Sequence, residues 1–337
     1  MLELKQGINL GGWFSQTPPD ETHYNEFITI KDIEWIASHN FDHIRLPVDY
    51  DFLETQDCQP VEAHYELIKK VIYWCKAYNL KLVLDLHKAY GYDFNTDSKK
   101  GNTLLFSDKE AKKRFITLWK TIAEHFKSYD FVAFELLNQV VNLEYASAWD
   151  KLAQKTTKQI RKIAKNNTII YGGVLWNSAE TIGLLSRPKD KNVMFTFHYY
   201  EPLLFTHQRA EWITNMPDFE VLYPDNAEFY QINSVPIGVQ AKSIFSYRNK
   251  EKIAKYFHSD LILKAFRYSN DICIPLYCGE FGVIDKAPVE STLNWFKDVI
   301  SVLQSYGIGY AVWNYKDMNF GISGSHYTKL IDEFFTL

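Results

Sequence analysis

The residues with most chemical potential stand at the ends of short apolar runs. Six runs contribute a guanidinium, imidazoles, amides, a carboxylate, a phenol and an indole: Arg45, His87, Asn138, Gln139, His198, Tyr200, Glu280 and Trp313. A lone histidine at such a place is more often a satisfied core residue, but eight polar or aromatic residues together indicate one site. Glu280 is the most telling, because an unpaired carboxylate in apolar surroundings is costly.

The elements that must position these residues are parallel strands. Eight runs of five to seven residues are rich in β-branched and aromatic residues and nearly continuous in apolarity, which is typical of strands buried on both faces. They span 6–10, 41–46, 81–86, 131–137, 167–172, 193–198, 274–279 and 308–313.

Helical patterns separate these runs. Ser107 and Glu110 have the spacing of a capping box, which predicts that a helix begins there. A buried face follows at helical spacing, with Phe115, Leu118, Trp119, Ile122 and Phe126. Comparable patterns cover 62–79, 144–165 and 289–306.

The alternation predicts an α/β protein with a single (β/α)₈ TIM barrel over residues 1–337. In such a barrel, catalytic residues gather at the carboxyl ends of the strands. The competing topology is a doubly wound open sheet, which would need a GxGxxG turn after its first strand, whereas residues 7–12 read GINLGG.

One connection is too long for a barrel helix. About 75 residues separate His198 from Ile274, where a crossover helix needs roughly 20–30. The excess, about 205–252, is rich in aromatic residues, so we expect a small inserted subdomain after strand 6, on the active-site face of the barrel. Two roles are open: a lid that stabilises the rim, or a wall of the ligand cleft.

Composition excludes several classes of function. The net charge of −4 gives no footprint for nucleic acid. No apolar run reaches the ~20 residues of a membrane helix, so no membrane partner is expected. The start MLELKQGINL lacks the pattern of a signal peptide, which indicates a cytoplasmic protein or a secreted one whose leader has been trimmed.

Four cysteines are too few to staple a chain of this size. We expect Cys58, Cys75, Cys273 and Cys278 to be reduced, buried thiols, with Cys273 and Cys278 on opposite faces of one strand.

The strand ends carry a family resemblance. The chain resembles glycoside hydrolase family 5, the cellulase family of retaining (β/α)₈ glycosidases, and within it the bacterial endoglucanases of the clostridial C type. The stretches that carry the likeness are GINLGGWF (7–14), FDHIRLPVDY (41–50), LDLH (84–87), FELLNQV (134–140), FHYY (197–200), FTHQRAEW (205–212), CGEFGV (278–283) and AVWNYK (311–316).

The resemblance implies catalytic roles for several positions. Glu280 matches the nucleophile, which must be ionised to form a covalent glycosyl-enzyme. Arg45 would hold down the pKa of Glu280 by opposite charge, and Tyr200 would orient Glu280 by a hydrogen bond. Asn138 matches the residue that binds the 2-hydroxyl of the sugar at the cleavage subsite.

The resemblance also implies substrate-binding positions. His87 and His198 match sugar-binding and charge-tuning residues, Trp313 matches the platform under the −1 sugar, and Trp212 is a further substrate-binding candidate. The family often has a Pro-Gly turn after His87, where this chain reads Lys88-Ala89-Tyr90-Gly91. Tyr90 and Tyr92 are therefore candidates for additional sugar platforms.

Gln139 departs from the family pattern, which has Glu as general acid and base. An amide has the shape of a protonated carboxyl group but no proton to donate, and loss of general acid–base help typically costs ~10²–10⁴-fold in rate. Two explanations compete: an engineered acid/base knockout, or a natural pseudoenzyme that binds glucan without cutting it. Glu135 lies further down the same strand and Glu144 where the next helix begins, so neither is expected to replace the acid.

The resulting hypothesis is a retaining endo-β-glucanase for β-1,4 and mixed-linkage β-1,3-1,4 glucans, nearly inactive because of Gln139. The alternatives are a non-catalytic glucan-binding pseudoenzyme, or within the family an exo-β-1,3-glucanase or β-mannanase. A metal-dependent hydrolase would need ligands on the first strand, where 6–10 reads QGINL. We expect no cofactor or metal, a β-glucan as partner, and a monomer.

Overall fold

The computed structural model describes residues 1–95, 103–248 and 252–335. Within them, eight parallel strands close into a barrel in the order β1-β10-β9-β6-β5-β4-β3-β2. The barrel strands are β1 (Gln6–Asn9), β2 (His43–Asp49), β3 (Lys81–Lys88), β4 (Val132–Glu135), β5 (Ile169–Gly172), β6 (Val193–Tyr199), β9 (Leu276–Phe281) and β10 (Gly309–Val312). The predicted (β/α)₈ fold is confirmed.

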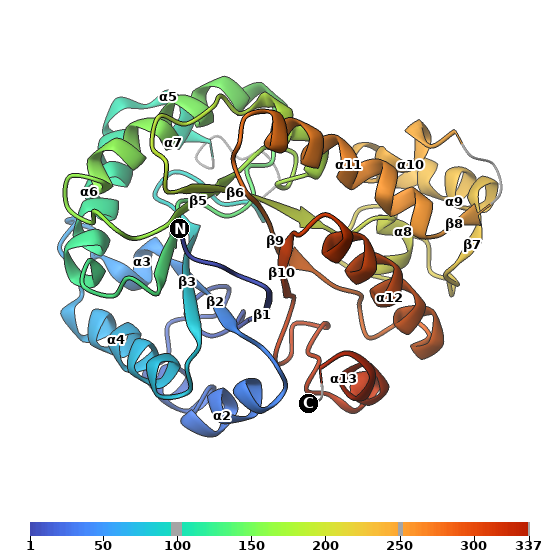
Figure 1. Cartoon of the computed structure of the whole chain (residues 1–337), viewed down its shortest axis with the longest axis horizontal. Coiled ribbons are helices and arrows are strands. Elements are labelled where there is room, and N and C mark those ends of the chain that lie inside the picture. Colours follow the sequence, from blue (N-terminus) through green and yellow to red (C-terminus); the bar gives the residue numbers. More distant parts are fainter. Residues whose placement is uncertain (96–102, 249–251, 336–337) are drawn as a thin grey trace.

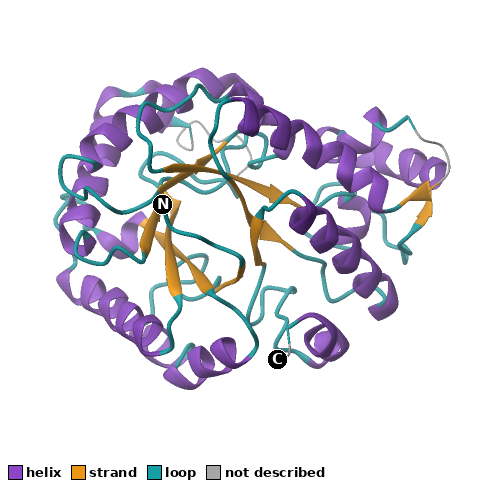
Figure 2. Ribbon diagram, viewed as in Figure 1, coloured by secondary structure: helices purple, strands orange, loops and turns teal. Residues whose placement is uncertain are grey.

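Helices surround the strands on the outside (Figure 2). They are α1 (Glu21–Glu26), α2 (Ile30–Ser38), α3 (Tyr50–Leu53), α4 (Glu62–Ala77), α5 (Leu104–Ser107), α6 (Lys109–Phe126), α7 (Ala146–Ile160), α11 (Lys255–Asp271), α12 (Val289–Ser305) and α13 (Thr328–Phe334), with short 3₁₀ segments η1 (Leu143–Tyr145), η2 (Ala179–Leu184) and η4 (Ser325–Tyr327). Between β5 and β6 the described chain forms only η2, against which α11 packs, so the expected alternation of strand and helix fails at this connection.

Helix α6 has the buried face predicted from the sequence but a different N-cap residue. Its five predicted core residues are all buried against the barrel. The predicted capping box is wrong, because α5 ends at Ser107 and Asp108 is the N-cap of α6. The carboxylate of Asp108 accepts a hydrogen bond from the backbone N–H of Ala111 at 2.8 Å. Either residue type can cap a helix, so the sequence did not distinguish two adjacent candidates.

The long connection between β6 and β9 contains a group of small elements. These are α8 (Leu203–Thr206), β7 (Asp225–Asn226), α9 (Ala227–Ser234), η3 (Val235–Ala241), α10 (Ser243–Ser246) and β8 (Lys252–Ile253). They project from one side of the barrel, next to α11 and α12 (Figure 1). Strand β8 pairs with β7 and so belongs to this group, and residues 249–251 of the expected insertion lie outside the described residues.

The interior of the barrel changes from apolar to charged along its axis. A small buried cluster takes one residue from each of six strands: Val83, Ala133, Ile170, Met194, Tyr277 and Ala311. Because strand side chains alternate between faces, the residues two positions further along also point inward. On β3 and β4 these are Asp85 and Glu135, both fully buried.

Strand β9 carries one more residue than the strand beside it. Phe197 pairs with Cys278 and His198 pairs with Glu280, so Gly279 is an extra residue in the ladder. Without this bulge, a strand whose Tyr277 faces inward would turn Glu280 outward; one extra residue reverses the face. The bulge therefore directs Glu280 to the end of the barrel interior.

Two of the four cysteines differ from expectation. Cys75 and Cys278 are buried, as predicted, but Cys58 and Cys273 are exposed. Cys273 precedes β9 and has φ of 56°, so it does not lie on the strand that carries Cys278. No helix in the described part of the chain is long and apolar enough to cross a bilayer.

Candidate active site

The site is organised around Arg45, a fully buried residue of β2. Its Nη1 donates to Oε1 of Glu280 at 2.7 Å, and its Nη2 donates to Oδ1 of Asn138 at 3.0 Å. On the side away from Glu280, Nε and Nη2 donate to the two carboxylate oxygens of Glu135 at 2.8 and 2.9 Å. Arg45 thus joins the strand-end residues to a carboxylate deeper in the barrel.

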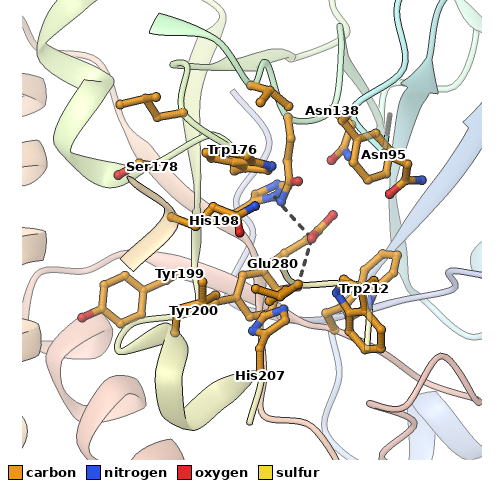
Figure 3. Close-up of a pocket in the computed structure, with 18 of the residues that line it drawn as sticks. Asn95, Asn138, Trp176, Ser178, His198, Tyr199, Tyr200, His207, Trp212 and Glu280 are labelled. Carbon is orange, nitrogen blue, oxygen red and sulfur yellow. Dashed lines mark hydrogen bonds and ion pairs between the residues drawn. The ribbon is translucent and has the colours of Figure 1, made fainter. Parts of the chain in front are cut away.

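Glu280 is held at both carboxylate oxygens. Arg45 donates to Oε1. The hydroxyl of Tyr200 donates to Oε2 at 3.0 Å, and Figure 3 shows Tyr200 beside Glu280. Burial is the dominant influence on its pKa, which lies above the ordinary value although Arg45, His87 and the Tyr200 hydrogen bond each lower it. Arg45 therefore lowers the pKa of Glu280 in the expected direction, but desolvation outweighs this attraction and the net pKa is raised.

His87 and Asn138 orient each other. Nδ1 of His87 lies 2.6 Å from Oδ2 of Asp85, and its Nε2 lies 3.3 Å from Nδ2 of Asn138. Burial lowers the pKa of His87 to about 4, so the ring is neutral at neutral pH. A neutral ring that donates from Nδ1 to Asp85 accepts at Nε2 from the Asn138 amide. With its Oδ1 bonded to Arg45, Asn138 has one defined amide orientation.

Gln139 and Glu280 both contact Nδ1 of His198. Nε2 of Gln139 lies 2.9 Å from Nδ1 of His198, and Nδ1 of His198 lies 3.3 Å from Oε2 of Glu280. The hydroxyl of Tyr92 donates to the backbone carbonyl of Gln139 at 2.6 Å and accepts from the backbone N–H of Val141 at 2.8 Å. The loop that carries Gln139 is therefore pinned on both sides of the residue.

Of the two candidates for additional sugar platforms, Tyr92 is among the residues that line the central cavity and Tyr90 is not. Tyr92 has only 4% of its surface exposed and uses its hydroxyl to hold the Gln139 loop. Tyr90 is more exposed, but its ring stacks against the guanidinium of Arg114 at 4.2 Å rather than lining the cleft.

Trp313 lies at the end of β10 with its indole parallel to the ring of His87, at 5.8 Å between centroids and 4° between planes. Gly11 makes room for it, because a Cβ there would lie 2.4 Å from Cη2 of the indole. The side chain of Asn314 ties the same segment to Gly11, accepting from its N–H at 2.8 Å and donating to its carbonyl at 3.1 Å. Gly11 is therefore required by the close packing of Trp313 against the loop after β1.

A cavity of about 940 Å³ opens over these residues. Barrel residues line it on one side, including Glu280, Gln139 and Trp313. The long connection after β6 lines the other, through His207, Trp212 and residues of η3 and α10 (Figure 3). All nine predicted site residues therefore gather at one end of the barrel, although Arg45 is buried beneath the cavity and does not line it.

Several residues of the site escaped sequence reasoning. Asn9 donates from Nδ2 to the carbonyl of Gly279 at 3.0 Å and accepts from Nη1 of Arg45 at 3.0 Å, so it supports both the bulge and the guanidinium. Trp176 lines the cavity close to His198 (Figure 3). It lies at the centre of three successive residues with φ between 53° and 58°. Backbone in this region is uncommon outside glycine and clusters at functional sites.

A signal for Trp176 existed in the sequence, since it follows the fifth apolar run by only a few residues.

Comparison with known families agrees with the geometry. The family model described as cellulase (glycosyl hydrolase family 5) matches residues 6–319. The chain belongs to glycoside hydrolase family 5.

Relatives of this family 5 chain include an endoglucanase and a cellodextrinase. Endoglucanase C of Acetivibrio thermocellus is 39% identical over 328 residues, covering 96% of this chain and 94% of that protein. Cellodextrinase A of Ruminococcus flavefaciens is 36% identical, covering 90% and 83%.

Solved structures share the fold of this chain. The cellulose synthase subunit Z of Clostridioides difficile superposes with a TM-score of 0.77 at 23% identity, covering 98% of this chain and 99% of that one. Cel5A of Thermotoga maritima in complex with cellobiose superposes with a TM-score of 0.75 at 24% identity, covering 97% of each.

Proposed function

We propose that this chain has the active site of a retaining endo-β-glucanase for β-1,4 and mixed-linkage β-1,3-1,4 glucans, in which Gln139 replaces the acid/base. The single observation that carries the proposal is the juxtaposition of Glu280 and Gln139 on either side of Nδ1 of His198. A retaining glycosidase needs two carboxyl groups about 5–5.5 Å apart, whereas an inverting one needs about 6.5–9.5 Å to admit a water. The close pair favours retention once residue 139 is a glutamate.

In the first step, a carboxylate oxygen of Glu280 attacks C1 of the sugar and the bond from C1 to the leaving oxygen breaks. The leaving oxygen requires a proton, which a carboxylic acid at position 139 would donate. In the second step, the resulting carboxylate would remove a proton from a water molecule as the water oxygen attacks C1, and the bond from C1 to Glu280 breaks to release the free carboxylate. Gln139 has no proton to donate and no basic site, so both steps lose their help and the chain is expected to be nearly inactive on glucan.

The remaining residues are assigned to substrate. Asn138, with its orientation set by His87 and Arg45, would bond the sugar 2-hydroxyl, a contact that strengthens in the transition state. Trp313 offers its ring face as a platform for the −1 sugar. We assign the connection after β6 as a wall of the cleft rather than a rim support, because Trp212 and Gln240 line the same cavity as Glu280.

The test is hydrolysis of barley mixed-linkage β-glucan by the chain and by its Gln139→Glu form. We expect a gain of about 10²–10⁴-fold or more in the substituted form. Gln240→Glu is the matched control, since it adds the same charge to the same cavity and is expected to restore nothing. If Gln139→Glu stays inert while the glucan still binds, the chain is a glucan-binding pseudoenzyme.

The products distinguish the alternatives within the family. An endo enzyme releases oligosaccharides of mixed length from the start of the reaction, whereas an exo-β-1,3-glucanase releases glucose. Activity on mannan but not on β-glucan would replace the proposal with a β-mannanase.

A further inference from the structure

Three carboxylates share the one guanidinium of Arg45. Glu135 faces Nε and Nη2 with both oxygens, Oδ2 of Asp85 lies 3.1 Å from Nη2, and Oε1 of Glu280 lies 2.7 Å from Nη1. The side chains of Arg45, Asp85 and Glu135 have no exposed surface, and that of Glu280 has 5%. The double displacement uses Glu280 directly; Asp85 orients His87, and neither Asp85 nor Glu135 has yet been given a role toward Glu280.

The donors of Arg45 are fully committed. Nε–H goes to Glu135, one N–H of Nη2 goes to Glu135 and the other points toward Asn138 and Asp85. Nη1 donates to Asn9 at 3.0 Å and to Glu280. A guanidinium has five N–H groups, so a single one remains for Glu280. The bidentate pair with Glu135 fixes which one it is, because the planar group cannot turn without breaking two parallel bonds.

The carboxyl groups around Arg45 also outnumber its positive charge. One positive charge faces three carboxyl groups in a water-poor interior, where like charges repel strongly. Burial raises the pKa of Asp85 and of Glu135 above the ordinary values, and the attraction of Arg45 opposes this rise; both oxygens of Glu135 accept from Arg45, as those of an ionised carboxylate do. Glu280 feels Asp85 as a like charge and Arg45 as an opposite one. Each carboxylate bound to Arg45 offsets part of the positive potential that the guanidinium creates at the other two.

We propose that Glu135 and Asp85 are positioning residues that hold Arg45 in one orientation and limit its attraction for Glu280, so that the nucleophile is oriented but not over-stabilised. The inference rests on the proposed role of Glu280. A carboxylate that is too well stabilised is a poor nucleophile, so two competing carboxylates behind Arg45 favour attack. Glu135 acts only through Arg45, because every hydrogen bond of its side chain among the described residues goes to that guanidinium.

The pKa of Glu280 is a measure of how strongly Asp85 and Glu135 compete with Glu280 for Arg45. The titratable and charged groups that face it from the surrounding strands are Arg45 on β2, Asp85 and His87 on β3, Glu135 on β4 through Arg45, and His198 and Tyr200 at the end of β6. Removing the charge of Glu135 makes the net potential at Glu280 more positive, because the negative charge that offsets Arg45 is gone. The pKa of Glu280 then falls.

The experiment measures covalent labelling of the unsubstituted chain by 2,4-dinitrophenyl 2-deoxy-2-fluoro-β-cellobioside as a function of pH. An oxygen of Glu280 bonds to C1, the bond from C1 to the aryl oxygen breaks, and dinitrophenolate leaves with the electron pair. No proton is transferred, so Gln139 does not interfere. The rate of dinitrophenolate release and the mass of the labelled peptide are the readouts.

We expect the half-maximal labelling rate of Glu135→Gln to move to lower pH than in the unsubstituted chain, and that of Asp85→Asn to move in the same direction. Glu135→Asp keeps the charge and should stay at the original pH. The matched control is Glu54→Gln, which removes a buried carboxylate from the 2.6 Å ion pair with Arg114, away from Glu280. Its labelling profile should not move.

Coincident profiles for Glu135→Gln, Glu54→Gln and the unsubstituted chain would overturn the inference and leave Glu135 a packing residue. Thermal unfolding of each variant identifies those that fold, and Asp85→Asn decides the question if Glu135→Gln does not. A chain that binds cellobiose but acquires no label on Glu280 at any pH would instead refute the proposed nucleophile. The two failures are therefore distinguishable.

Discussion

Gly11 and Trp313 lie so close that a methyl group at residue 11 would be only 2.4 Å from the indole. They belong to opposite ends of the chain, and the contact joins the loop after β1 to the end of β10. The backbone of Gly11 is also bonded to Asn314, so this loop cannot move away to relieve a clash.

Gly11→Ala is therefore expected to displace the ring of Trp313 from the cavity. In the Gln139→Glu form, the substitution should raise KM for mixed-linkage glucan and lower kcat/KM by about tenfold or more, because the −1 platform moves. Gly183→Ala is the control, since a Cβ at Gly183 meets no atom within 4 Å. Equal kinetics for both alanine variants would contradict the assignment of Trp313 as a platform.

Tyr92 sets the position of residue 139 through the backbone on both sides of it. Tyr92→Phe in the Gln139→Glu form should lower kcat about tenfold and lower the free energy of unfolding by about 1–3 kcal/mol, because two partly buried backbone groups lose their hydrogen bonds to the hydroxyl. Tyr65→Phe is the matched control, since the buried hydroxyl of Tyr65 has no hydrogen-bond partner in the described structure. A Tyr92→Phe form with unchanged kcat would show that the loop is held by other contacts.

The acid limb of activity follows from the burial of Glu280. The nucleophile reacts as the carboxylate, and burial raises its pKa above the ordinary value for glutamate. In the Gln139→Glu form, kcat/KM should therefore fall as the pH drops through a value higher than that of an exposed glutamate. A pH series with mixed-linkage glucan measures this limb. A limb at or below the ordinary range would mean that Arg45 outweighs desolvation.

His258 predicts a pH dependence of stability. Its ring lies between the hydroxyls of Tyr199 and Tyr223, at 2.7 Å from each, and burial lowers its pKa to about 3. The unfolded chain takes up a proton near the ordinary value of about 6.5, so stability is lost as the pH falls from there toward 3. Urea unfolding at pH 7 and pH 5 should show this loss, and His258→Gln should reduce the difference between the two. An unchanged difference would assign the effect to other groups.

Trp212 is expected to bind sugar at the wall of the cleft formed by the long connection. It is 55% exposed and lines the same cavity as Glu280. Trp212→Ala should weaken cellooligosaccharide binding by about tenfold, which corresponds to roughly 1.4 kcal/mol. Tyr256, 78% exposed and absent from the cavity, provides the control variant Tyr256→Ala. Calorimetric titration of the unsubstituted chain and both variants measures the difference.

Much of this architecture was legible in the sequence. Parallel strands buried on both faces must be continuously apolar, so eight such runs indicated the barrel. The carboxyl ends of parallel strands meet at one edge, which is why residues as distant as Arg45 and Glu280 could be assigned to one site. The length and aromatic content of the connection after His198 similarly predicted extra structure there.

Other features depended on contacts between distant segments. The bulge at Gly279 reverses the face to which Glu280 points, and the side chain that supports it, Asn9, belongs to another strand. The net rise in the pKa of Glu280 results from a balance between burial and Arg45 that no local pattern contains.

The sequence by itself determined which elements form and which residues reach the active end of the barrel, because hydrophobic periodicity is a local property. Only the tertiary structure decided how those residues divide their hydrogen bonds. The guanidinium of Arg45 has a fixed number of donors, and their allocation among Asp85, Glu135 and Glu280 is set when four strands close around it.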